Sequence, residues 1–300
     1  METRFPTPER LERRRIGVFL LVAFGVSWAT ALAIWATGGL TDSPEITEGI
    51  TLATVLLPSA YMFGPAIGAV AARLATGEGC QHHRLRPEFE GTMWLYAAAW
   101  LAPAGLVVAG SALYFAVFPG QFDPTMAAFR GQLAAAGVAM DPRLLAVIQI
   151  IAALTVAPLI NGLLAFGEEY GWRAYLLPKL WPLGRRRAIV LTGVVWGVWH
   201  WPIIAMGYNY GFDYPGFPWT GMVAFLAFTV GAGTFLAVLT EREGSVWPAS
   251  VGHGAINAIA GVAVLFVAGQ PNSLLGPTPV GVLAALPWLA LAVWLLGDSD

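Results

Sequence analysis

Long stretches without a charged residue dominate the chain and alternate with short polar segments. Six of these stretches hold between 24 and 32 residues and a seventh holds 54: 16–41, 49–72, 91–122, 144–167, 188–212, 214–240 and 244–297. A helix needs about 20 predominantly apolar residues to cross a bilayer. The stretches show no period-two alternation of apolar and polar residues, so they are predicted to be helices and not strands.

The last stretch is long enough for two spans. Gly269-Gln270-Pro271-Asn272-Ser273 is typical of a turn and divides it. The pattern therefore predicts an all-α, polytopic membrane protein with about eight transmembrane helices. Residues 1–300 are expected to form a single integral membrane domain.

The distribution of lysine and arginine predicts the orientation of these spans. Fourteen lie in the segment before the first span and in the even-numbered loops, whereas the odd-numbered loops hold only Arg130 and Arg143. Because cytoplasmic loops carry an excess of positive charge, both termini are expected in the cytoplasm.

Composition excludes several other classes of protein. Apolar residues make up 57% of the chain and charged residues 11%, whereas a soluble chain has about 25% charged residues. The net charge of −2 offers no basic field for nucleic acid. The single cysteine excludes an intramolecular disulfide, and its loop, Cys80-Gln81-His82-His83, is interpreted as a solvated loop and not a metal site.

Two adjacent carboxylates at the end of the fourth span are unusual at membrane depth. Arg173 lies four residues after Glu169, so the two side chains share a helix face and are expected to pair. Glu168 is rotated by about 100° from Glu169 and lacks that partner. Glu169 is therefore predicted to be structural and Glu168 to be available for chemistry.

Two histidines lie inside later spans. His200 belongs to Trp196-Gly197-Val198-Trp199-His200, and His253 precedes Asn257 by one helical turn. The depth of each group is counted from a charged residue taken as the cytoplasmic boundary of its helix: Lys179 for Glu168, Arg187 for His200 and Glu243 for His253. A helix rises about 1.5 Å per residue, so all three groups are expected about 15–20 Å into the membrane. Three helices thus bring ionisable groups to one depth, which favours a shared site over three separate packed side chains.

This set of side chains suits hydrolysis of an amide. Glu168, His200 and His253 can hold a Zn²⁺ ion with an open position for water, or Glu168 can act as a general base while a histidine orients the water. Asn257 offers an amide donor for an oxyanion. A proton-coupled transporter and a non-catalytic scaffold that binds a peptide are the alternatives.

Three motifs in this order resemble those of the CPBP family, the CAAX-protease and bacteriocin-processing (Abi) intramembrane endopeptidases. Glu168-Glu169-Tyr170-Gly171-Trp172-Arg173 resembles Glu-Glu-x-x-x-Arg, Trp196 to His200 resembles aromatic-x-x-x-His, and His253 to Asn257 resembles His-x-x-x-Asn. The second motif has Trp where Phe is common. The resemblance covers about 145–260, and the residues before it match only as generic helices.

The resemblance implies an intramembrane protease whose cavity opens to the cytoplasm. It implies that Glu168 and His200 activate water, that His253 and Asn257 stabilise the oxyanion, and that the substrate is a membrane-associated, possibly lipidated, protein or peptide. It leaves open whether the enzyme is a metalloprotease or a glutamate-dependent one. The composition, with one lysine against fifteen arginines, indicates a prokaryotic cytoplasmic membrane.

Overall fold

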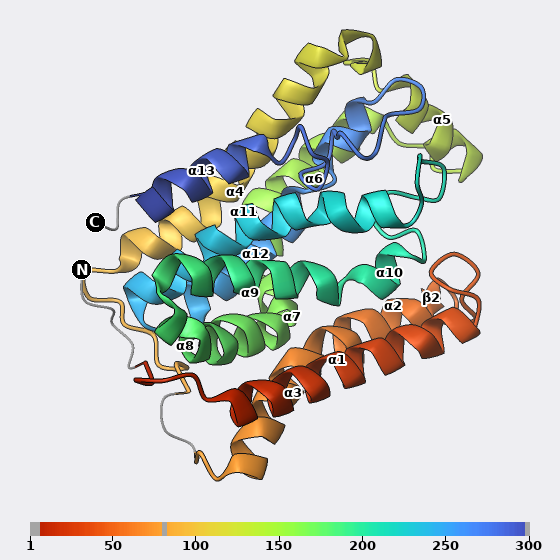
Figure 1. Ribbon diagram of the computed structural model, residues 1–300. Helices are drawn as coiled ribbons and strands as arrows, with labels where there is room; N and C mark the ends of the chain where they lie inside the picture. The colour runs from red at the N-terminus through yellow and green to blue at the C-terminus, as the bar shows by residue number, and fades with distance from the viewer. Residues whose placement is uncertain (1–6, 80–82, 298–300) are drawn as a thin grey trace.

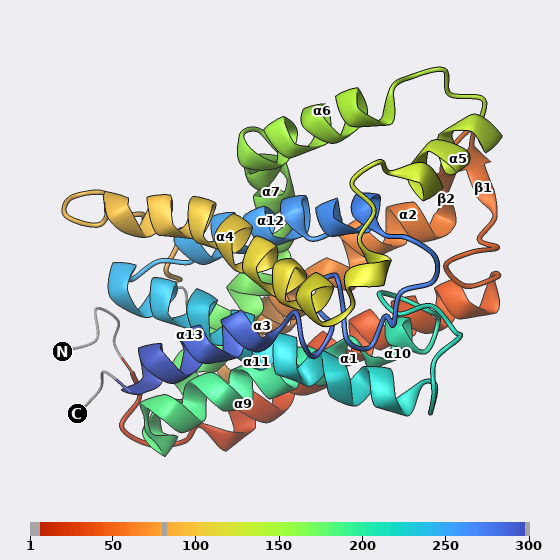
Figure 2. The same ribbon diagram turned by 90° about the horizontal axis from the view of Figure 1, so that it is seen from above.

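The structure is a computed structural model that describes residues 7–79 and 83–297. It is an all-helical bundle (Figures 1 and 2), and a hairpin of β1 (Glu45–Thr47) and β2 (Ile50–Thr51) is the sole sheet within those ranges. Five described helical segments are long and apolar enough to cross a membrane, or six if a bent pair counts as one span. The predicted fold class is thereby confirmed, while the count of eight and the cytoplasmic termini remain predictions.

The N-terminal part of the chain forms a tight helical hairpin. Helix α1 (Arg13–Ala36) packs along a second rod made of α2 (Leu52–Leu56), the π-helix η1 (Leu57–Tyr61) and α3 (Met62–Thr76). Glycine permits the close approach, because a Cβ added at Gly64 would lie only 2.0 Å from the hydroxyl oxygen of Ser27.

Four helical segments connect this hairpin to the helix that carries the paired carboxylates. They are α4 (Met93–Val117), η2 (Pro119–Gln121), α5 (Ala127–Ala135) and α6 (Pro142–Leu154). The predicted span at 144–167 is not one helix, because α6 and the helical rod Ala157–Leu183 meet at an angle of 57°. Pro158 explains the break, since proline has no N–H to bond to the carbonyl of Leu154 four residues earlier, and its ring clashes with that carbonyl.

The rod after the break is built from four consecutive segments. These are α7 (Ala157–Glu169), the π-helix η3 (Tyr170–Leu176), α8 (Leu177–Leu180) and η4 (Trp181–Leu183). It therefore extends well beyond Glu168, which the sequence pattern placed at a span end. The paired carboxylates lie near the middle of the rod, inside the protein.

The C-terminal half surrounds one central helix. Helix α11 (Trp219–Glu243) is the most buried of the candidate spans and packs against helices on several sides. Its neighbours are α9 (Arg185–Trp199), α10 (Trp201–Ile204), α12 (Trp247–Ile259) and α13 (Leu286–Gly297). The short helix η5 (Val262–Phe266) follows α12, and the connection to α13 is much longer than the predicted turn at 269–273.

Helices α9 and α13, the predicted fifth and eighth spans, are shorter than the sequence pattern suggested. Helix α9 has 15 residues and begins with three arginines, and α13 has only 12 residues. The start of α1 and the end of α13 nevertheless lie at the same end of the molecule (Figures 1 and 2), as an even number of passes requires.

The contact between α7 and α12 allows no side chain at Gly254. A Cβ at this position would lie 2.3 Å from the carbonyl oxygen of Pro158 and 2.4 Å from the amide nitrogen of Gly162. We expect Gly254→Ala to force the helices apart and to lower the free energy of unfolding by about 1–3 kcal/mol. Thermal unfolding in detergent measures this, and Gly105→Ala, where nothing lies within 4 Å, is the control that should not be destabilised.

Candidate active site

The six predicted site residues come together from three parts of the bundle. Glu168 and Glu169 end α7, Arg173 lies in η3, His200 follows α9, and His253 and Asn257 lie in α12. Four of them line a single cavity of about 370 Å³: Glu168, His200, His253 and Asn257. Glu169 and Arg173 lie behind this lining, where Glu169 is hydrogen-bonded to His253 and Arg173 stacks on Trp196.

Glu169 is the centre of a buried ionic cluster. Its Oε1 accepts a hydrogen bond from Nη1 of Arg173 at 2.9 Å, which confirms the predicted pairing. The same oxygen lies 2.8 Å from Nδ1 of His253. Glu169 and Arg173 are fully buried, and the guanidinium also stacks over the ring of Trp196 at 4.5 Å. Glu169 therefore links α7, which carries it, to α12.

Glu168 points away from this cluster, as its position one residue earlier predicts. Helical spacing predicts no partner for it, but it has one in the structure: Trp196 Nε1 donates to Oε2 of Glu168 at 2.7 Å. Sequence reasoning missed this role of Trp196, although the residue stands at the aromatic position of the second motif. The single hydrogen bond holds the carboxylate at the wall of the cavity.

His200 has a defined ring orientation. Its Nδ1 lies 2.9 Å from the carbonyl oxygen of Trp196, and because a carbonyl only accepts, Nδ1 carries the proton. The aromatic rings of Trp199 and Phe225 pack against the imidazole, each with its centroid 4.7 Å away. This arrangement leaves Nε2 with its lone pair for a proton or a metal ion.

Asn257 lies on the same face of α12 as His253, one turn further on, and lines the same cavity. Among the described residues its side-chain amide has no hydrogen-bond partner, and the residue is exposed. The predicted pairing of these two residues on one helix face is therefore present. The amide is available to a ligand in the cavity.

The donor types in the cavity suit zinc, although the conformation described does not gather them. Glu168, His200 and His253 are the ligand types that catalytic zinc uses, and each Nδ1 is already bonded to a carbonyl or carboxylate, as is usual for zinc ligands. Over residues 7–79 and 83–297, no three His, Cys, Asp or Glu side chains are close enough together to hold a metal ion.

The loop with Cys80 was interpreted as solvated. Cys80, Gln81 and His82 lie outside the described residues. His83 is described, and its Nδ1 is hydrogen-bonded to the hydroxyl of Tyr170 in η3. This contact ties the end of the loop to the helical rod that carries Glu168.

Segments outside the three motifs also contribute to the cavity wall. They include Leu57 of η1, Tyr208 and Asn209 after α10, and Val280 before α13. The loop after α10 lies at the end of the molecule opposite the start of α1 and the end of α13 (Figure 1).

A charged cluster at the other end anchors the rod that carries Glu168. Glu78 is hydrogen-bonded to Lys179 and accepts from the hydroxyl of Tyr175 at 3.2 Å. Burial raises the pKa of Glu78, but the bond from Lys179 and the charges of Lys179, Arg73 and Arg15 outweigh it and hold that pKa below its usual value. The carboxylate is thus ionised at neutral pH and fixes α8 against the loop after α3.

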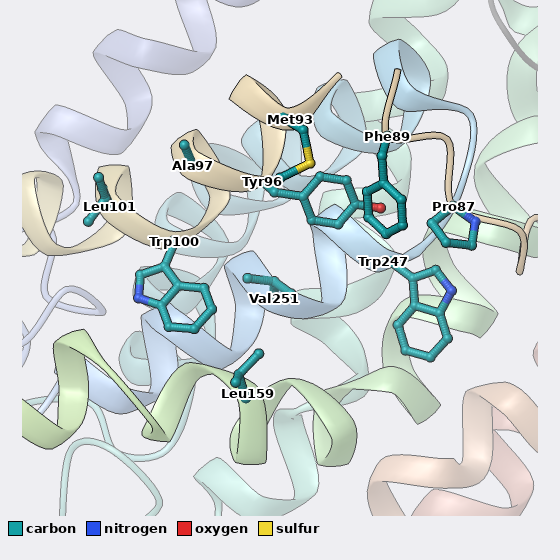
Figure 3. A pocket seen from close by; sticks show the side chains of 10 residues that line it. All are labelled: Pro87, Phe89, Met93, Tyr96, Ala97, Trp100, Leu101, Leu159, Trp247 and Val251. Atoms are coloured by element: carbon teal, nitrogen blue, oxygen red, sulfur yellow. The ribbon is translucent and has the colours of Figure 1, made fainter. Parts of the chain in front are cut away.

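A second and larger cavity contains none of the site residues. It measures about 640 Å³, lies between α4, α7 and α12, and is lined almost wholly by apolar side chains (Figure 3). Tyr96 is its one ionisable residue, and the hydroxyl of Tyr96 donates to Glu243 at 2.9 Å. Without a carboxylate or imidazole in its wall, this cavity has no group to activate water.

The two adjacent carboxylates are expected to respond differently to substitution by glutamine. Glu169→Gln leaves the buried charge of Arg173 without its ion pair, so it should lower the free energy of unfolding by about 3–5 kcal/mol. Glu168→Gln keeps an oxygen that accepts from Trp196 and should leave stability near that of the unsubstituted protein. Thermal unfolding of both variants in the same detergent tests this; equal stability of the two would contradict the assignment.

The geometry agrees with the comparison to known families. Residues 142–259 match the family model described as type II CAAX prenyl endopeptidase Rce1-like, and this segment contains all three motifs. A search of curated proteins found no match. The match supports an integral, multi-pass membrane endopeptidase that acts on membrane-associated protein. Over residues 142–259, which is less than half of its length, the chain is similar to the CAAX protease (CPBP) family of intramembrane endopeptidases.

Proposed function

We propose that the chain hydrolyses a peptide bond inside this cavity, with Glu168 and His200 activating the attacking water and His253 and Asn257 stabilising the oxyanion. The observation that carries the proposal is the cavity itself. Two imidazoles, a carboxylate and an unpartnered amide from three helices line the same 370 Å³ space. Positioned groups of these types supply general-base and electrostatic catalysis.

The first step is attack by water. The carboxylate of Glu168 takes one proton from the water while Nε2 of His200 orients it, and the oxygen forms a bond to the scissile carbonyl carbon. The carbonyl electron pair moves to oxygen, which gives a tetrahedral oxyanion. Trp196 keeps the carboxylate in place through its 2.7 Å hydrogen bond.

The second step is collapse of the tetrahedral species. Nε2 of His253 and the amide of Asn257 donate to the oxyanion, and Glu169 supports the protonated imidazole through its 2.8 Å contact with Nδ1. The carbon–nitrogen bond then breaks, and the proton held by Glu168 passes to the leaving amine. This returns Glu168 to its ionised state.

Zinc is the alternative agent of water activation. A bound Zn²⁺ would be held by Glu168, His200 and His253 and would supply Lewis-acid activation of water. His253 would then use Nε2 as a ligand, and could not donate from that atom to the oxyanion. Nε2 of His253 therefore carries a proton in the metal-free mechanism and carries none in the zinc mechanism.

The walls of the cavity indicate the kind of peptide it accepts. Aromatic and aliphatic side chains form most of them, among them Trp199, Phe225, Phe228, Ile256 and Val280. An apolar peptide segment at the membrane surface fits this lining. We propose such a membrane-associated segment, from a protein or peptide with or without a lipid group, as substrate in a prokaryotic cytoplasmic membrane.

The side from which substrate enters follows from the orientation. The lysine and arginine distribution predicts cytoplasmic termini. We propose that the cavity opens to the cytoplasm, as the resemblance to the family implies.

Loss of the Glu168 carboxylate should abolish peptide cleavage. Glu168→Gln removes the proton acceptor, so the turnover number should fall by about 100-fold or more while the protein stays folded. Cleavage of a peptide library by purified protein in detergent is the measurement. Full activity of Glu168→Gln would move the base elsewhere, and an inactive unsubstituted protein with intact folding would favour the non-catalytic scaffold.

Metal analysis decides between the two forms of water activation. The proposal expects purified protein to be active without stoichiometric metal, and His200→Ala to lose activity with no change in metal content. One zinc per chain, lost in both His200→Ala and His253→Ala, would instead make these residues ligands.

Single cysteines decide the orientation. In a Cys80→Ser background, Asp213→Cys lies in the exposed loop between α10 and α11, and Arg187→Cys lies in the exposed first turn of α9. An impermeant maleimide added to intact cells should label Asp213→Cys and leave Arg187→Cys unlabelled. The reverse pattern would place both termini outside the cytoplasm and would overturn the proposed direction of the cavity.

A further inference from the structure

The helix that carries His200 breaks directly after that residue. Pro202 has no N–H to donate, and the amides of Ile203 and Ile204 both bond to the carbonyl of His200 at 3.1 Å. In a continuous α-helix the amide of Ile203 would bond to the carbonyl of Trp199 instead. The break therefore leaves the carbonyl of Trp199 without a helical partner, although Trp199 is fully buried.

The same break determines how the imidazole of His200 is held. The amide of His200 bonds to the carbonyl of Gly197 at 3.1 Å, one residue short of its α-helical partner Trp196. The carbonyl of Trp196 is thereby released and accepts from Nδ1 of His200 at 2.9 Å. The rotamer and the tautomer of His200 thus depend on keeping this tightened turn.

Two side chains from the N-terminal hairpin replace the missing helical bond. The hydroxyl of Tyr61 donates to the carbonyl oxygen of Trp199 at 2.6 Å, and Nε1 of Trp28 donates to the same oxygen at 3.1 Å. Both lone pairs of the buried carbonyl are then satisfied. The ring of Tyr61 also packs on that of Trp199 with centroids 4.3 Å apart.

Tyr61 is itself held in place. It ends the π-helix η1, is 1% exposed, and its own carbonyl accepts from the hydroxyl of Ser27 at 2.8 Å. Ser27 and Trp28 are neighbours in α1, so one turn of α1 contacts both Tyr61 and Trp199. These residues lie outside 142–259, the segment that matches the family model.

We propose that Tyr61 and Trp28 are positioning residues for His200, acting through the carbonyl of Trp199. The N-terminal helical hairpin is then a working part of the active site and not only a membrane anchor. This inference rests on the proposed function for its kinetic test, but its structural content concerns the state of one imidazole and is testable without a substrate.

Tyr61→Phe and Trp28→Phe each remove one donor and keep an aromatic ring. We expect each to lower the turnover number several-fold and the double variant to lower it by about 10- to 100-fold, with KM little changed, because the water-activating ring is displaced while the peptide-binding walls remain. Tyr114→Phe and Trp100→Phe are matched controls, since their polar atoms bond to groups outside this cavity.

A spectroscopic readout separates this inference from the proposed function. The chain has four histidines, so ¹⁵N-histidine labelling with assignment by His200→Ala isolates the signal of His200. We expect a single Nδ1–H tautomer in the unsubstituted protein and a shifted or mixed signal in the double variant, with both controls unchanged. An unchanged His200 signal in the double variant would overturn the inference, whether or not the protein cleaves peptides.

If the variants change the His200 signal and leave the turnover number unchanged, the positioning role is also overturned. If the unsubstituted protein cleaves no peptide while the signal responds as expected, the proposed function fails and the structural link stands. Thermal unfolding of the two single variants is the folding control.

Discussion

The ion pair between Glu169 and Arg173 is the interaction on which the site depends. Both side chains are fully buried in a protein whose surroundings are apolar, so neither charge is tolerable without the other. The same carboxylate oxygen contacts His253, which draws α12 onto α7. The charge compensation that the membrane demands therefore also aligns the two helices that carry Glu168 and His253.

Around this pair, the candidate site lies at interruptions of regular helix. Glu168 precedes the π-helix η3, the break imposed by Pro202 follows His200, and Tyr61 ends the π-helix η1. The break at His200 leaves the carbonyls of Trp196 and Trp199 without their helical partners, and in a membrane such groups must be satisfied within the protein. The imidazole of His200 bonds to the first carbonyl, and Tyr61 and Trp28 bond to the second.

The two large cavities show why chemistry and not size identifies the site. The larger, between α4, α7 and α12, is lined by apolar groups, as a surface that meets lipid tails should be (Figure 3). The smaller brings polar atoms from three helices to one apolar-walled space. A low-dielectric surrounding strengthens each hydrogen bond and charge inside it, and this suits the activation of water.

The sequence alone determined the helical membrane architecture, because charge-free runs of this length have no other stable structure in lipid. It also determined that Glu169 pairs with Arg173 and that His253 and Asn257 share a face, since both follow from helical spacing. The spacing of residues along one helix does not determine which residues of other helices they contact. The partnership of Glu168 with Trp196, the bond from Glu169 to His253 and the contacts of Tyr61 and Trp28 with Trp199 were decided by tertiary structure, because they depend on how separate helices cross.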